Sequence, residues 1–275
     1  MKRYIILLGV FGLLFSSSIQ AQDDAVYPPF ETITLIDNHT TLNPYKGSIT
    51  IDIQHRFSPI ASVKDLFGIY GSANTRISAG YGVTDKIMVG FGTTRDKKLQ
   101  DLEWKVSLLS QTESGKIPVS VSYVGNTVLN ASDATKFGPS NEFKFAHRMS
   151  YMNQIVVSRK FGEKIGLLVA PTFIWLNAVE EGYHNANFSI YGGLRAQVLG
   201  FHSIILEYDQ PITKADHVDI YPNLSLGAEI GTSTHSFRVF VANYNAIVKN
   251  YNVVYNTNNP FSLDYQFGFN ISIRF

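Results

Sequence analysis

The chain has 275 residues, a formal net charge of +1 and no cysteine. The absence of cysteine excludes disulfides, cysteine metal sites, cysteine nucleophiles and the lipidated cysteine of a bacterial lipoprotein. The near-neutral charge gives no sign of the basic surface that binds nucleic acid. Hydrophobic residues make up 45% of the sequence and charged residues 16%, below the roughly one quarter of a typical soluble domain. We therefore expect part of the apolar surface to face something other than water.

The first 21 residues have the pattern of a secretory signal peptide. Lys2 and Arg3 form a positive start, residues 4–15 are apolar, and small and polar residues lead to a predicted cleavage after Ala21. The apolar run is short for a membrane-spanning helix, and no later stretch reaches about 18 apolar residues. The sequence therefore predicts an exported protein in which any membrane crossing is made by strands.

Residues 22–45 contain Pro28, Pro29 and Pro44 and show no clean hydrophobic period, so we expect a periplasmic lead-in ahead of a barrel formed by residues 46–275. From there on, apolar and polar residues alternate in many stretches, as they do in a strand with two different faces. The facing of residues 165–176 stays open, because nearly every residue in that stretch is apolar. The predicted strands are 48–57, 74–83, 87–94, 102–111, 117–126, 145–159, 165–176, 188–198, 203–209, 223–231, 235–242 and 262–275.

The last of these stretches, SLDYQFGFNISIRF, alternates without a slip from Ser262 to Phe275. One face is apolar and rich in aromatic residues, and the other is polar. The stretch is longer than the usual strand of about five or six residues and suits a tilted strand that crosses a bilayer. A terminal aromatic residue after such a strand resembles the C-terminal signature of bacterial outer-membrane barrels. The expected partners are therefore outer-membrane lipids and, through Phe275, the barrel assembly machinery.

The lengths of the predicted connections also follow a pattern. Those after the second, fourth, sixth, eighth and tenth strands are short, and those after the odd-numbered strands are longer. Outer-membrane barrels have short periplasmic turns and longer extracellular loops, whereas a soluble sandwich has no reason to sort its loops in this way. The predicted fold is therefore an all-β, antiparallel, up-and-down transmembrane β-barrel of about 12 strands. Its oligomeric state stays open.

Three stretches carry a resemblance to a known family: IQHRF at 53–57, the segment 67–90 that includes GSANTR and YGVTDKIMVG, and Trp104-Lys105-Val106 with the residues up to Gln111. Together they resemble an uncharacterised family of Bacteroidota outer-membrane β-barrel proteins, classified as a domain of unknown function. Ser58 stands where the family pattern has a glycine, so the first loop starts differently. The resemblance implies a membrane barrel and supplies no substrate or catalytic residue.

The polar parity of the predicted strands gathers charged residues on the face that would line the lumen. These candidate lumen residues are Asp52, Arg56, Arg76, Glu103, Lys105, Arg148, Arg195, Glu207, Glu229, Arg238, Asp264 and Arg274. They form either a charged pore wall that selects solutes or a set of ion pairs that fills the barrel. Twelve tilted strands enclose a backbone diameter of roughly 24 Å and leave roughly 10 Å inside the side chains.

Glycines on the same parity favour some open space in the lumen, because they carry no side chain. They are Gly80, Gly82, Gly90, Gly92, Gly193 and Gly227. The sequence therefore predicts a narrow channel for small hydrophilic solutes. The alternative is a non-conducting barrel that anchors or binds partners, with 127–142 and 243–260 as recognition loops.

A lipid-modifying enzyme is a more distant alternative. Outer-membrane phospholipases carry a His and a Ser two residues apart on one strand, so that both point to the same face. This chain has no such pair, since His147 is followed at that spacing by Met149. His184, His202 and His217 lack metal-ligand spacing. We therefore predict no catalytic, cofactor-binding or metal-binding residue.

Overall fold

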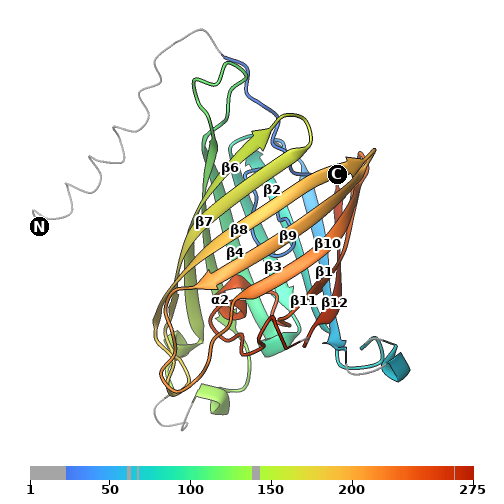
Figure 1. Ribbon diagram of the computed structural model, residues 1–275. Coiled ribbons are helices and arrows are strands. Elements are labelled where there is room, and N and C mark those ends of the chain that lie inside the picture. The colour runs from blue at the N-terminus through green and yellow to red at the C-terminus, as the bar shows by residue number, and fades with distance from the viewer. Residues whose placement is uncertain (1–22, 61–62, 67, 138–142, 263) are drawn as a thin grey trace, which may run out of the picture.

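The computed structural model describes residues 23–60, 63–66, 68–137, 143–262 and 264–275, so the predicted signal peptide at 1–21 lies outside the described residues. Twelve strands form a closed barrel in which each strand pairs with its neighbours in the sequence and β1 pairs with β12 (Figure 1). All the pairings are antiparallel. The predicted fold class is confirmed. Among the described residues, no helix has the length and apolar character needed to span a membrane.

The strands are β1 (Ile49–Pro59), β2 (Asn74–Thr84), β3 (Ile87–Thr94), β4 (Leu99–Leu109), β5 (Ser120–Asn130), β6 (Met149–Phe161), β7 (Ile165–Leu176), β8 (Ala186–Leu199), β9 (His202–Pro211), β10 (Asn223–Gly231), β11 (His235–Ala242) and β12 (Gln266–Arg274). The helical turns are η2 (Val63–Asp65), η3 (Asp96–Lys98), η4 (Ala134–Phe137), η5 (Phe145–Arg148) and α2 (Lys249–Asn252). The predicted bounds of β3, β7, β10 and β11 match the observed ones. The predicted sixth and twelfth strands begin too early, because 145–148 forms a helical turn and 261–262 forms a turn ahead of the first paired residue, Gln266.

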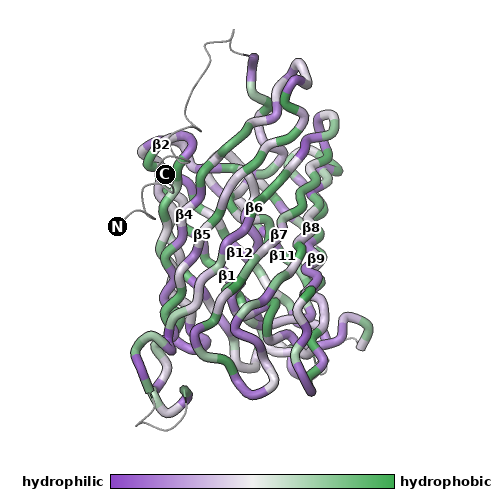
Figure 2. The backbone as a smooth tube through the Cα atoms, turned by 90° about the vertical axis from the view of Figure 1, so that its left-hand side faces the viewer, coloured by the Kyte–Doolittle hydropathy of each residue, from purple (hydrophilic) through white to green (hydrophobic). Residues whose placement is uncertain are grey.

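Alternation of side chains between the two sides of the barrel accounts for the sequence pattern. Apolar residues such as Ile77 and Phe91 are exposed on the outside, while the polar residues between them are buried inside. Figure 2 shows hydrophobic and hydrophilic segments along the strands of the barrel. In β7, whose facing the sequence left open, Val169 points outward, whereas Leu168 and Ile174 are buried inside. Both faces of β7 are apolar because its inner face packs against an apolar cluster within the barrel.

The connections sort to the two ends of the barrel, which we call the turn end and the loop end (Figure 1). The turn end has the connections 85–86, 162–164, 200–201 and 232–234, and the loop end has 60–73, 131–148, 177–185, 212–222 and 243–265. Two connections depart from the predicted lengths: 95–98 at the loop end is short, and 110–119 at the turn end is long. The latter is long because it pairs with the N-terminal segment, where the Val26 amide donates to the Gln111 carbonyl at 2.8 Å.

Two segments outside the strands enter the barrel. The plug segment, residues 29–43, comes from the turn end, and the mouth loop, residues 243–260, with α2 comes from the loop end (Figure 1). Residues 32–41 of the plug segment are all buried. The predicted lead-in at 22–45 was drawn as a segment ahead of the barrel, and the structure places most of it within the lumen. No hydrophobic period marks it, because it is an irregular loop surrounded by the barrel wall.

An arginine introduced on the outer face of the barrel tests whether the apolar side chains on that face contact membrane lipid. Leu226, near the middle of β10, and Leu109, at the end of β4, are about equally exposed on the outer face, at 50% and 49%. We expect Leu226→Arg to cost about 2–4 kcal/mol of folding free energy and Leu109→Arg about 0–1 kcal/mol, because the cost of a lipid-facing arginine falls toward the membrane interface. Urea unfolding in lipid vesicles measures both. Equal costs at the two positions would contradict a membrane-spanning orientation of these strands.

Candidate functional site

The interior of the barrel holds most of the charged residues that the sequence assigned to the lumen. Nine of the twelve are buried on the inner face, namely Asp52, Arg56, Arg76, Glu103, Lys105, Arg195, Glu207, Glu229 and Arg238. Their alternation with outward apolar residues places them there, since the period of a strand is two residues. The lumen is therefore the candidate functional site.

The other three predicted lumen residues lie elsewhere. Arg148 belongs to η5 at the loop end, where its guanidinium donates to the Asn130 carbonyl and lies 5.0 Å from the ring centre of Phe143. Asp264 is exposed before β12 and accepts a hydrogen bond from the Ser262 hydroxyl. Both differ from prediction because the strands start later than the alternating pattern suggests. Arg274 lies at the rim of the turn end, partly exposed.

Some wall charges pair with one another between strands that are separated by one intervening strand. Arg76 lies 2.7 Å from Asp101, and Arg195 lies 2.5 Å from Glu229. Arg238 lies 3.4 Å from Asp52. Asp101 is not among the predicted lumen residues, because the predicted fourth strand starts one residue after it. The alternation of that strand, extended by one residue, places Asp101 on the inner face.

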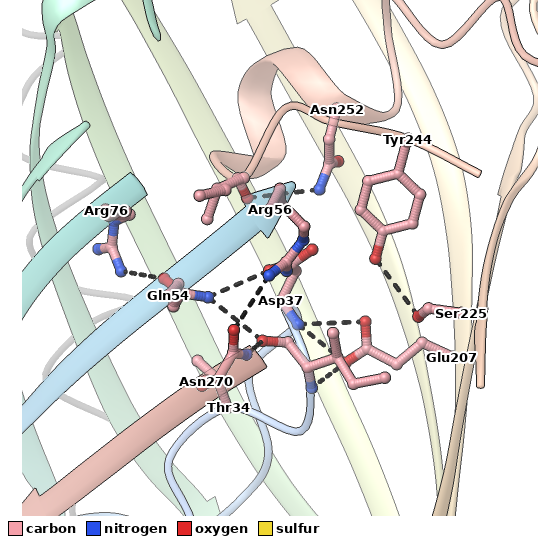
Figure 3. Close-up of polar contacts among 12 residues, drawn as sticks. Thr34, Asp37, Gln54, Arg56, Arg76, Glu207, Ser225, Tyr244, Asn252 and Asn270 are labelled. Carbon is pink, nitrogen blue, oxygen red and sulfur yellow. Dashed lines mark hydrogen bonds and ion pairs between the residues drawn. The ribbon is translucent and has the colours of Figure 1, made fainter. Parts of the chain in front are cut away.

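One wall carboxylate, that of Glu207, binds the backbone of the plug tip. The Glu207 carboxylate accepts the backbone N–H groups of Ile36 at 2.7 Å, Asp37 at 3.2 Å and Asn38 at 3.2 Å. Figure 3 shows Glu207 beside Asp37. It also accepts from the Asn38 side chain and the Tyr191 hydroxyl, each at 3.1 Å. Hydrogen bonds to an ionised acceptor are among the strongest in proteins, so Glu207 fixes the tip.

A buried ion pair lies beside the same tip. The Arg56 guanidinium is 2.5 Å from the Asp37 carboxylate, and neither side chain is exposed. Gln54 donates to Asp37 at 3.1 Å and Asn270 donates to the Ile36 carbonyl at 2.7 Å (Figure 3). Arg56 also lies over the Phe240 ring, 4.3 Å from its centre. Neighbouring strands β1 and β12 therefore hold the plug tip from the side opposite Glu207.

Other wall cations bind the backbone of the plug segment. The Lys105 ammonium donates to the carbonyls of Ile33 at 3.3 Å, Thr40 at 3.2 Å and Leu42. Arg238 donates to the carbonyls of Thr34 at 2.7 Å and Leu35 at 2.9 Å. These cations satisfy carbonyl groups that an irregular buried segment cannot pair within itself. The wall therefore binds the plug segment chiefly through main-chain groups.

Two side chains of the plug segment, His39 and Glu31, also contact charged residues of the wall. His39 Nε2 lies 3.3 Å from Glu103 deep in the barrel. Glu31 lies at the turn end, 3.2 Å from Arg195 and 3.7 Å from Arg274. These partners could not be predicted, because the plug segment lacks the alternation that located the wall residues.

The inward glycines do not leave open space, contrary to the expectation from the sequence. A Cβ at Gly80 would lie 3.2 Å from the Ile33 side chain, and one at Gly90 would lie 2.8 Å from the Glu103 carboxylate. A Cβ at Gly82 would meet the backbone of Tyr45. The room beside these glycines is occupied by the plug segment, by the chain that follows it and by neighbouring wall side chains.

The mouth loop fills the half of the barrel nearer the loop end. The Lys249 ammonium of α2 pairs with Asp209 of β9 and lies 5.5 Å from the ring centre of Tyr191. Asp209 also accepts from the Asn38 side chain of the plug segment at 3.1 Å. The two segments that occupy the lumen therefore meet at one wall carboxylate. Neither Asp209 nor Lys249 is among the lumen residues predicted from the sequence.

A pair resembling part of a hydrolase site occurs on the outer face, where His55 Nδ1 lies 3.0 Å from the Thr75 hydroxyl. Nucleophilic catalysis also uses a third group that orients the base. Among the described residues, no side-chain carboxylate or amide hydrogen-bonds to the His55 ring. At the loop end, His184 lies 3.5 Å from Asp216, and both side chains are exposed to solvent. Neither arrangement provides a complete catalytic constellation.

The closed strand order, the outward apolar face and the buried polar interior define a membrane β-barrel. The chain belongs to the family described as membrane bound beta barrel domain (DUF5777), which matches residues 30–275 and so includes nearly all of the plug segment. The predicted family of unknown function is confirmed, and its bacterial group stays a prediction. No curated protein matches this sequence.

Solved outer-membrane proteins share the fold. A NanC porin matches with a TM-score of 0.52 and 6% sequence identity, over 82% of this chain and 98% of the porin. A KdgM porin in complex with disordered oligogalacturonate matches with a TM-score of 0.50 and 8% identity, over 82% and 98%. Outer membrane phospholipase A from Escherichia coli matches with a TM-score of 0.45 and 13% identity, over 90% and 98%. At these identities the likeness to the two porins extends to the fold alone.

Proposed function

We propose that this protein is a gated channel of the bacterial outer membrane for small hydrophilic solutes, closed in the described state by the plug segment. The main observation behind this proposal is that charged side chains of the barrel wall bind the main chain of the plug segment, which is not part of the barrel sheet. Lys105 and Glu207 have their described polar partners mostly in that segment. Its departure would leave a polar wall rather than a collapsed apolar core. The fold shared with two porins supports a channel.

Release of the plug segment would expose a ring of charges of both signs around a lumen roughly 10 Å wide. Rings of charged side chains filter ions and solutes by sign. Water can replace the backbone partners of Lys105 and Glu207, so the exposed wall would be stable in an open state. The proposed function is passive passage of solutes, which requires neither a catalytic residue nor a cofactor.

The proposed orientation places the turn end in the periplasm and the loop end outside the cell, as in bacterial barrels of this kind. Export would use the signal peptide, with cleavage near Ala21. Insertion would use the assembly machinery, which would bind the last strand ending at Phe275. Membrane fractionation of a tagged chain, with protease digestion of intact cells, tests the location and the side on which the loop 131–148 lies.

Planar-bilayer conductance tests the channel. The native chain is compared with a variant in which residues 29–43 are replaced by a Gly/Ser stretch of equal length. We expect a mostly silent native protein and discrete conductance steps from the variant. In that background, Arg76→Glu should shift the ion preference toward cations, because it reverses one charge of the wall. Folding of each protein is checked by its heat-modifiable migration on a gel.

The mouth loop favours a second candidate, a non-conducting barrel that binds partners at its surface, because this loop also occupies the lumen. A third protein, with residues 29–43 and 243–260 both replaced, separates the two candidates. Conductance from this protein but not from the single variant would show that the mouth loop is a second gate. A silent bilayer from all three correctly folded proteins would overturn the channel and favour the non-conducting barrel.

A further inference from the structure

The outer face of the barrel carries a single charged side chain within the twelve strands that the structure describes. Every other Asp, Glu, Lys and Arg residue of these strands occupies an inward position, whereas Arg159 of β6 is exposed on the outer face between Val157 and Phe161. A charge that faces the hydrocarbon of a bilayer is unfavourable, and its cost falls toward the membrane interface. Arg159 lies close to the end of β6, near the connection 162–164 of the turn end. This position brings its guanidinium to the level of lipid head groups.

The Arg159 guanidinium has no acidic partner in the described part of the chain. Its central carbon lies 5.1 Å from the ring centre of Phe161, so the ring covers one face of the planar group. The N–H donors lie in the plane of the guanidinium and match the oxygens of a carboxylate or phosphate. Glu163, the nearest acid in the sequence, contacts Lys160 instead, at 3.5 Å. The charge of Arg159 is therefore available to an anionic partner from outside the chain.

An apolar hollow lies beside Arg159 on the outer face of β6, β7, β8 and β9, which are neighbours in the barrel (Figure 1). Its volume is about 640 Å³, and Arg159 and Phe161 belong to its lining. Gly192 gives the hollow its depth, because it stands between Val169 of β7 and Tyr208 of β9 without a side chain. A Cβ at Gly192 would come no closer than 4.0 Å to any described residue other than its two chain neighbours. The outer surface is therefore recessed at this point.

Two other features of the outer face provide a comparison. At Gly125, also an outward glycine, a Cβ would lie 2.2 Å from the Trp104 ring, so an aromatic side chain already fills the gap. A second hollow, of about 520 Å³, lies nearer the loop end and includes Ile155 and Phe188 in its lining. Its described lining contains no charged residue. Of these three places, the hollow beside Gly192 alone combines an open apolar recess with an unpaired cation.

From these observations we propose that the hollow beside Gly192 binds an anionic phospholipid, with one acyl chain over Gly192 and the head-group phosphate at Arg159. Arg159 is opposite Leu167 in the strand ladder. Gly192 is opposite Val169, which lies two residues farther from the turn end, roughly 7 Å along a strand. The phosphate therefore lies at the membrane interface, and the chain extends toward the centre of the bilayer.

The chemistry of the lining separates this ligand from other occupants. A guanidinium forms two parallel hydrogen bonds with a phosphate, and apolar side chains favour hydrocarbon, so a free phosphate ion would leave the recess unfilled. A second copy of the barrel would bring an outer face whose described strands offer no carboxylate to Arg159. A zwitterionic head group carries its own cation, which weakens its attraction to Arg159. The inference rests on the membrane location of the barrel and not on whether the lumen conducts.

Quenching of tryptophan fluorescence by brominated lipid tests this inference on the full chain in lipid vesicles. Trp104 and Trp175 are replaced by Phe, and Tyr208→Trp places a single reporter at the hollow. The vesicles mix phosphatidylglycerol and phosphatidylcholine with the same acyl chains, and each lipid is brominated in turn. We expect the relative binding constant of phosphatidylglycerol to be about fivefold higher at this reporter, the contribution of one basic side chain near an anionic lipid surface. Phe188→Trp, in the second hollow, should show no preference.

Arg159→Gln should abolish the preference at the Tyr208→Trp reporter. Lys164→Gln is the matched control, because it removes the same charge from the adjoining turn, outside the hollow, and should leave the preference unchanged. Heat-modifiable migration checks the folding of each variant. No preference at Tyr208→Trp, an equal preference at both reporters, or equal losses in the two charge variants would overturn the site, whatever the conductance. Weak quenching by both lipids together with a cross-linked dimer would overturn it as well, since a second copy would then cover the hollow.

Discussion

Asp37→Ala is expected to release the plug segment from the barrel wall. The substitution leaves the Arg56 guanidinium, which is 0% exposed, without its carboxylate partner. Removing one partner of a buried ion pair costs about 3–5 kcal/mol, because the other charge stays buried and unpaired. Arg56 keeps a hydrogen bond to the Asn270 side chain at 3.0 Å, which does not neutralise its charge. We therefore expect a larger population of the open state, in which the plug segment has left the wall and water solvates Arg56.

A thiol reporter measures this release. The chain contains no cysteine, so Thr41→Cys provides a single thiol at a plug position that is 5% exposed. Labelling by a water-soluble thiol reagent then follows the opening of the plug segment. If the free energy of binding between the plug segment and the wall is weakened by about 3 kcal/mol or more, the labelling rate should rise on the order of a hundredfold. Each 1.4 kcal/mol corresponds to a factor of about ten.

The double variant Asp37→Ala/Arg56→Met separates charge from packing. Methionine keeps an unbranched apolar side chain over the Phe240 ring and removes the unpaired charge. We expect its labelling rate to return most of the way to that of the native sequence, since replacing both members of a buried pair by apolar groups is often close to neutral. Equal rates in the single and double variants would show that the ion pair does not hold the plug segment.

The strands could be predicted from the sequence because one physical rule governs them. A wall between lipid and a polar interior requires alternation at every position, and this rule located residues as deeply buried as Arg56, Lys105 and Glu207. It was ambiguous only where the interior is itself apolar, as in β7, whose inner residues pack against the mouth loop. Where strands end depends on local turns, and the early starts predicted for β6 and β12 reflect alternation that continues beyond the hydrogen-bonded ladder.

The contents of the lumen could not be predicted in the same way. The plug segment has no period, because each of its residues meets a different part of the wall. Its backbone is bound by side chains far away in the sequence, as with Ile36 and Glu207, and no local pattern records such a contact. The inward glycines illustrate the difficulty, since an absent side chain indicates either open space or close approach of another segment. At Gly80 and Gly82, the structure shows close approach.

Glu207→Ala should detach the tip of the plug segment even with the Asp37–Arg56 pair intact. The carboxylate is the acceptor for three consecutive backbone N–H groups, those of residues 36–38. Hydrogen bonds to a charged group contribute about 1.5–3 kcal/mol each, and buried donors left without a partner carry a desolvation cost. Alanine provides no acceptor, so water must enter to satisfy the three donors. Glu207→Gln keeps the carbonyl acceptor without the charge and should have a smaller effect.

The Thr41→Cys reporter measures this effect, with Glu229→Ala as the control. Glu229 is also a fully buried wall acid, but its partner is Arg195 of the wall, 2.5 Å away, rather than a backbone group at the plug tip. We expect faster labelling in the order native, Glu207→Gln, Glu207→Ala. Glu229→Ala should stay near the native rate, because the freed Arg195 still has Glu31 within 3.2 Å. If both alanine variants accelerate labelling equally, general loosening of the wall, rather than loss of the tip contact, controls the plug segment.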